Sequence, residues 1–139
     1  RLTDEQIYGL HLYGDCHVAP SFGEAWNIPA FDAMGFGKTP ICINHGGPKD
    51  YIIPDKLNTG TIIESYPEIV CGMEDTLQDM FTGRETWFNA DRDELQYAMR
   101  HYYENKDCRG GLQPYIDGLE QAKKFSYEAV GKKIAEILL

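Results

Sequence analysis

The sequence predicts an α/β fold, a Rossmann-like parallel sheet with flanking helices, on three observations. Segments with helical periodicity alternate with short apolar segments from residue 3 to residue 65. The connections between these segments are short. The segment Thr39 to Asn44 is compact and apolar, like a strand that is buried on both faces of a parallel sheet. Such an alternation indicates parallel strands joined by helices that cover the sheet.

Capping residues and glycines set the predicted boundaries in the first half. A helix over Thr3 to Tyr13 begins with a capping-box pair, Thr3 and Gln6, and Gly14 ends it. A strand over Cys16 to Ala19 follows, and Asn27 then caps a second helix that runs to Phe36. The other elements predicted in this half are a strand over Thr39 to Asn44, a short helix near Pro48 to Ile53 and a strand over Thr61 to Glu64.

The second half is less regular. Glu68 to Phe81 is predicted as one irregular helix and Glu85 to Asn89 as a strand. Asp91, with Glu94 three residues later, begins a helix that runs to Asn105. Two more helices are predicted, one over Leu112 to Lys123 and one that Ser126 caps, in which Tyr127, Val130, Ile134 and Ile137 repeat at helical spacing.

Residues 1–139 show no internal domain boundary, and we expect them to form a single domain. The parallel strands predicted in residues 1–139 are fewer than the five or six of a typical doubly wound sheet. We therefore expect this domain to be incomplete, with further strands preceding residue 1.

Composition excludes several classes of function. The formal net charge of −9 argues against nucleic acid as a partner, because binding it needs clustered Lys and Arg. No apolar run approaches the ~18 residues of a membrane span, and the first residues do not resemble a signal peptide. The four cysteines form no C-x-x-C pair, so a zinc site is not expected. Dispersed cysteines in apolar segments indicate a reducing, cytoplasmic compartment.

The densest candidate site is the segment from residue 20 to residue 40. A strand ends there and a helix begins, which is where ligands bind in open parallel α/β sheets. The new helix offers free N–H groups and the positive end of its dipole, which suit a diphosphate. Glu24 and Asp32 stand eight residues apart around this junction. Ionised carboxylates accept hydrogen bonds from neighbouring hydroxyls, so the two acids suit the diols of a nucleotide-sugar.

A simpler interpretation of the two acids exists. Glu24 would merely complement the helix dipole, and Asp32 would be a solvated charge on the helix surface. The surroundings favour the functional interpretation, because Asp32 lies among apolar residues and a charge there needs a partner. These neighbours are Ile28, Phe31, Ala33 and Met34.

The segment resembles the signature of the retaining GT-B glycosyltransferases that include glycogen and sucrose synthases. That signature has the pattern PS-x-x-E-G-F-G-x-P-x-x-E-A-M-A-x-G-x-P-V. The residues that follow it in the same order are Pro20, Ser21, Glu24, Pro29, Asp32, Ala33, Met34, Gly37 and Pro40. A strand and the Gly46-Gly47 turn come next, as in the family, and the similarity covers roughly residues 3 to 65. The resemblance implies the C-terminal donor-binding domain of a GT-B enzyme.

The resemblance also implies roles for individual residues. Glu24 would face the transferred sugar and the reaction centre as the catalytic acid residue, and Asp32 would bind the ribose hydroxyls. The backbone that would line the sugar and diphosphate belongs to Ala25, Trp26, Asn27 and Ile28. At Gly46 and Gly47 we expect a tight turn where backbone approaches a ligand. No metal or other cofactor is expected, and the partners would be a nucleotide-sugar and an N-terminal acceptor domain.

Two departures from the pattern bear on these roles. Asp32 replaces Glu and is one methylene shorter, and Ala25 and Asn27 replace the two glycines, which narrows the backbone geometry. The alternative function is a non-catalytic nucleotide-binding or interaction module derived from this domain. A related UDP-sugar 2-epimerase would share the fold but fits the motif less well. The ring of Trp26 is equally compatible with ligand contact and with packing, and His45 with ligand contact or a structural place in the turn.

Overall fold

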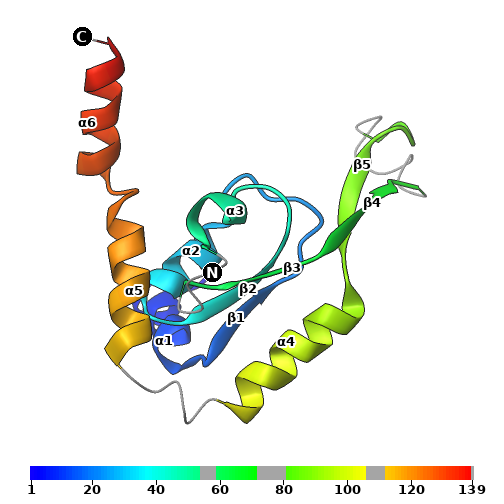
Figure 1. Cartoon of the computed structure of the whole chain (residues 1–139), viewed down its shortest axis with the longest axis horizontal. Helices are drawn as coiled ribbons and strands as arrows, with labels where there is room; N and C mark the ends of the chain where they lie inside the picture. The colour runs from blue at the N-terminus through cyan, green and yellow to red at the C-terminus, as the bar shows by residue number, and fades with distance from the viewer. Residues whose placement is uncertain (54–58, 72–80, 106–111, 139) are drawn as a thin grey trace.

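The computed structural model describes residues 1–53, 59–71, 81–105 and 112–138. Its centre is a parallel sheet in the order β1 (Cys16–Ala19), β2 (Thr39–Ile43) and β3 (Thr61–Ile63). Figure 1 shows helices on both sides of this sheet. The predicted α/β fold, a Rossmann-like parallel sheet with flanking helices, is therefore confirmed.

One face of the sheet is covered by α2 (Ile28–Gly35), α3 (Pro48–Tyr51) and α5 (Leu112–Lys123). The buried residues of this cluster come from α2, β2 and the α3 segment: Ala30, Met34, Cys42, Tyr51 and Ile52. α5 packs on α2, and Gly118 permits the close approach, because a Cβ at that position would collide with the carbonyl oxygen of Met34. This cluster lies directly beneath the start of α2, where the candidate site was predicted.

The opposite face is covered by α4 (Arg92–Glu104). Ile41 and Ile43 point to this face because successive residues of a strand alternate between faces. They pack with Ile63, Ala98 and Tyr102 in a second buried cluster. The hydroxyl of Tyr102 lies 2.8 Å from Thr61 Oγ1, which joins α4 to β3.

The predicted helix starts are confirmed by their capping hydrogen bonds. Thr3 and Gln6 form both bonds of a capping box at the start of α1 (Asp4–Tyr13). Asp91 accepts from the amide of Glu94 at the start of α4, while the Glu94 side chain accepts from Glu64 N instead of closing a capping box. The Ser126 hydroxyl accepts from Ala129 N at the start of α6 (Tyr127–Leu138).

The segment after β3 departs from the prediction. β4 (Ser65–Ile69) and β5 (Thr86–Ala90) form an antiparallel hairpin, so the helix predicted from Glu68 is wrong at its first two residues, and its residues 72–80 lie outside the described part. Pairing with β5 outweighs local helix propensity here, and Pro67 is tolerated in an edge strand. The strand predicted over residues 85–89 is confirmed with a shift of one residue.

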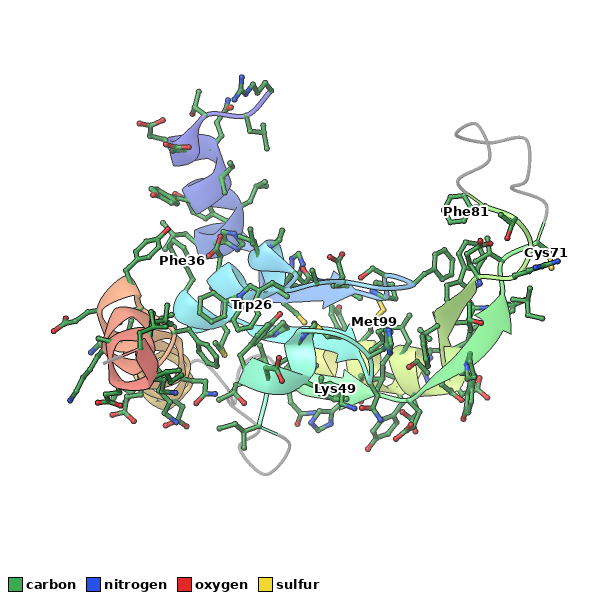
Figure 2. The ribbon with its side chains drawn as sticks, turned by 90° about the horizontal axis from the view of Figure 1, so that it is seen from above. Trp26, Phe36, Lys49, Cys71, Phe81 and Met99 are labelled. Carbon is green, nitrogen blue, oxygen red and sulfur yellow. The ribbon has the colours of Figure 1, made fainter. Side chains whose placement is uncertain are left out.

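Helices α1 and α6 leave their apolar residues exposed, and neither contains a buried residue. Figure 2 shows α1 rising away from the sheet, and Figure 1 shows α6 standing clear of it. The apolar repeat predicted in α6 exists, with Val130 and Ile134 39% and 51% exposed. Every described helix is too short or too polar to span a bilayer.

The close packing of α5 on α2 predicts opposite effects of alanine at two helical glycines. Gly118→Ala should lower the free energy of unfolding by about 2 kcal/mol, because its Cβ collides with Met34 O. Gly131→Ala in α6 should raise it by up to about 1 kcal/mol, because nothing lies within 4 Å and alanine favours the helix. Urea denaturation measures both, and equal effects of the two substitutions would contradict the packing.

Candidate functional site

The candidate site lies on the loop between β1 and α2, at the carboxyl edge of the parallel sheet. The turn after β2 and the hairpin after β3 leave the sheet at the same edge, because parallel strands point the same way. Three connections therefore meet around Glu24. This is the position where ligands bind in open α/β sheets.

The Gly46–Gly47 turn packs against the backbone of this loop. Gly47 N donates to Glu24 O over 3.2 Å. A Cβ on Gly46 would collide with the carbonyl oxygen of Glu24, and a Cβ on Gly47 with that of Ala25. Gly46 also has a φ of 74°, in the left-handed region. The predicted tight turn is thus present, and the backbone that it approaches is that of the Glu24 loop. Its contact with a ligand stays a prediction.

Asn27 ends the loop in a left-handed conformation, with a φ of 60° and a ψ of 69°. Its side-chain oxygen accepts from Ala30 N over 3.3 Å, and its carbonyl oxygen accepts from Tyr51 OH over 3.3 Å. Asparagine tolerates this conformation better than other non-glycine residues. Among described non-glycine residues only Asn27 has a positive φ, so Ala25 needs no glycine conformation. Neither of the two glycine replacements therefore requires a backbone conformation that its residue would not tolerate.

Trp26 is packed in an aromatic cluster under the loop. Its ring lies 5.5 Å from Phe31, 5.2 Å from Tyr51 and 5.1 Å from Phe125, measured between centroids. Such tilted and edge-on pairs stabilise a core beyond their buried area. Of the two interpretations left open for this ring, the structure favours packing. Figure 2 shows Trp26 in the centre of the molecule, beside the sheet.

Glu24 is exposed on the loop, directly above the end of β2. Burial first, and then the nearby Cys16 and Glu24, raise the pKa of the Cys42 thiol to about 12. The pKa of Tyr51 is raised by burial first and then by Cys42 and Glu24. The Glu24 carboxylate therefore acts electrostatically on the residues below the loop, while it remains open to solvent.

Asp32 lies elsewhere on α2, in the wall of a cavity of about 390 Å³. Glu24 does not line this cavity, so the structure does not bring the two acids into one pocket there. The cavity lies between α1, β1 and α2, and its lining residues are Ile7, Leu10, His11, Gly14, Cys16, His17, Ile28, Pro29, Asp32, Ala33 and Lys38. Ile28 belongs both to this cavity and to the first turn of α2.

Sequence reasoning did not assign His11, His17 or Lys38 to a site. Burial lowers the pKa of His17, and the neighbouring His11 lowers it as well. Both effects favour the neutral form of His17. The sequence of β1 did not indicate that His17 lines a cavity, because the other residues of this short strand are apolar. These side chains come from α1, from β1 and from the segment after α2, so they meet only in the folded chain, which no short-range pattern specifies.

The hairpin contributes contacts that sequence reasoning also missed. Trp87 stacks on Phe22, with ring centroids 4.2 Å apart, and Phe88 N donates to Phe22 O over 2.9 Å. His45 stacks on Phe88 at 3.7 Å. Of the roles open for His45, a structural place in the turn is the one the structure favours. The hairpin is thereby attached to two of the connections at the carboxyl edge.

Comparison with protein families matches the chain to the model described as "Glycosyl transferases group 1" over residues 1–100. The chain belongs to this family. The match includes the Glu24 loop, the Gly46–Gly47 turn and both strands of the hairpin. It therefore extends beyond the segment whose motif resembles the retaining enzymes. No curated protein matches the chain.

In this group 1 glycosyltransferase domain, the described residues contain no cluster of three or more His, Cys, Asp or Glu side chains fit to hold a metal ion.

The left-handed conformation of Asn27 predicts that glycine replaces it better than alanine. Asn27→Ala should lower the free energy of unfolding by about 2 kcal/mol, from backbone strain and the lost cap. Asn27→Gly should cost less than about 1 kcal/mol, because glycine adopts the same φ. Chemical denaturation of both variants tests this, and an alanine variant as stable as the glycine variant would show that the conformation carries no strain.

Proposed function

We propose that this glycosyltransferase domain binds a nucleotide-sugar donor at the carboxyl edge of its sheet and supplies the donor site for transfer with retention of anomeric configuration. The observation that carries the proposal is the fixed course of the Glu24 loop. Gly47 holds the middle of the loop through the carbonyl of Glu24, and Asn27 holds its end. The loop leads directly into α2. An exposed carboxylate thus stands beside a helix start at a ligand-binding edge.

The diphosphate of the donor would lie against the loop and the first turn of α2. The amide of Ala30 already donates to the side-chain oxygen of Asn27, and Pro29 has no N–H to donate. The amides of Ala25, Trp26 and Ile28 donate to no carbonyl among the described residues. These amides, with the positive end of the helix dipole, are the donors that the structure leaves for a phosphate.

The nucleoside would occupy the cavity beside Asp32. Its volume of about 390 Å³ is within the usual range for small-molecule sites, and its walls are mostly apolar. The Asp32 carboxylate suits a pair of ribose hydroxyls. Ile28 and Pro29 of the first turn of α2 line the cavity, whereas Gly14 and Lys38 place its other end near the amino ends of β1 and β2. The proposal therefore requires the ligand to extend along α2 from the helix start to Asp32.

Glu24 would face the sugar. During transfer the bond from the anomeric carbon to the phosphate oxygen breaks, and the oxygen of an acceptor hydroxyl bonds to the same face of the sugar. The proton of that hydroxyl passes to the departing diphosphate oxygen. The electron pair leaves with the diphosphate, where the amides stabilise it. Positive charge develops at the anomeric carbon, as in other glycosyl transfers, and a nearby carboxylate stabilises it. An N-terminal acceptor domain of the same enzyme would supply the second substrate.

The role of Glu24 predicts that Glu24→Gln abolishes transfer without disturbing the fold. In the full-length protein, release of sugar from UDP-, GDP- and ADP-sugars should fall at least about a hundredfold, because the neutral amide cannot stabilise the developing charge. The matched control is Glu104→Gln, an equally exposed glutamate at the end of α4.

Glu104→Gln should keep wild-type activity, and circular dichroism should show both variants folded. Full activity of Glu24→Gln would refute the catalytic role. Binding of the donors without turnover by any variant, wild type included, would favour the non-catalytic module instead.

A further inference from the structure

The β4–β5 hairpin contacts the same loop that carries Glu24. Trp87 of β5 stacks on Phe22 with an interplanar angle of 15°, and the next residue, Phe88, donates its amide hydrogen to Phe22 O. Phe22 stands two residues before Glu24 in the chain. A second stack, His45 on Phe88, joins the hairpin to the turn that holds Glu24 O through Gly47.

The hairpin is itself firmly joined to the sheet. Asp91 N donates to Glu64 O over 2.8 Å, and Glu64 N donates to Glu94 Oε2 over 2.7 Å. Tyr66 OH donates to Asp91 Oδ2 over 3.2 Å. These bonds tie β4 to the end of β3 and to the start of α4. Figure 2 shows Cys71 and Phe81 at the far end of the hairpin, away from Trp26. The end of the hairpin that contacts the loop is therefore held in place by hydrogen bonds to the sheet and to α4.

The loop is thus held at three places. Hairpin contacts hold Phe22, the Gly-Gly turn holds the carbonyl of Glu24, and α2 with Tyr51 holds Asn27. Fixing both ends of a short loop restricts the orientations of the side chain between them. A catalytic carboxylate gains from such restriction, because misplacement by a fraction of an ångström is costly.

We propose that the β4–β5 hairpin is a positioning element of the donor site and that Trp87, through Phe22, sets the place of Glu24. The inference rests on the proposed function of Glu24 and adds to it a residue that does not touch the substrate. It assigns a role to a hairpin of which the sequence predicted only the second strand.

Trp87 can be substituted so that the aromatic stack is kept or removed without the loss of a hydrogen bond seen in the structure. Its indole Nε1 is buried and has no hydrogen-bond partner among the described residues. Trp87→Phe therefore keeps a ring for stacking and removes no hydrogen bond seen in the structure. Trp87→Ala removes the ring and the stack together.

Amide hydrogen exchange of the full-length protein tests the proposal. In Trp87→Ala, exchange over residues 21–27 should be at least about tenfold faster than in the wild type, while β2 exchanges at its wild-type rate. In Trp87→Phe, exchange over the loop should stay within about twofold of the wild type. Transfer kinetics supply the second readout, in which Trp87→Ala lowers kcat with little change in the donor KM.

The outcomes separate this proposal from the proposed function. Unchanged loop exchange in Trp87→Ala overturns the positioning role, and so does a Trp87→Phe variant as defective as Trp87→Ala. Activity that survives Glu24→Gln overturns the proposed function, while faster loop exchange in Trp87→Ala would still support the positioning of the loop. Where the wild type turns over no donor, the exchange measurement alone decides the role of the hairpin.

Discussion

The contact between the Gly46–Gly47 turn and the backbone of residues 24–26 is the constraint on which the site depends. Parallel pairing of β1 and β2 brings the two connections to one edge, with Ala19 opposite Cys42 at the strand ends. Only residues without a Cβ permit the backbones to approach so closely. The turn thus acts as a template for the loop, and the position of Glu24 follows from it.

Asn27 shows how a motif is preserved while its residues change. The resemblance places a glycine at this position, and its replacement by most residues would strain a left-handed backbone. Asparagine adopts that conformation and adds a side-chain cap to α2, so the chain course is retained and the helix start is stabilised. Asparagine therefore serves at a position where the family pattern has glycine, because it tolerates the left-handed backbone that this chain adopts there.

Much of the fold was predictable from the sequence, because its information is local. The capping residues Thr3, Asn27 and Ser126 fixed three helix starts, and the apolar strand at residues 39–43 identified the parallel sheet. The hairpin was not predictable, since Ser65 to Ile69 acquires its structure by pairing with a strand that lies some twenty residues later. The cavity beside Asp32 was missed for the same reason, because its lining residues come from three elements, α1, β1 and α2, that meet only in the folded chain.

The separate settings of Glu24 and Asp32 suit a ligand that extends from one to the other through the start of α2. In the proposed function, the diphosphate of this ligand bridges the two acids and lies against the amides between them. The most direct measurement is a ¹⁵N–¹H spectrum of the full-length protein titrated with UDP, GDP and ADP. The account predicts that at least one nucleotide shifts the amide signals of Ala25, Trp26 and Ile28. Shifts confined to α4 or α6, or no shift with any of the three at millimolar concentration, would contradict it.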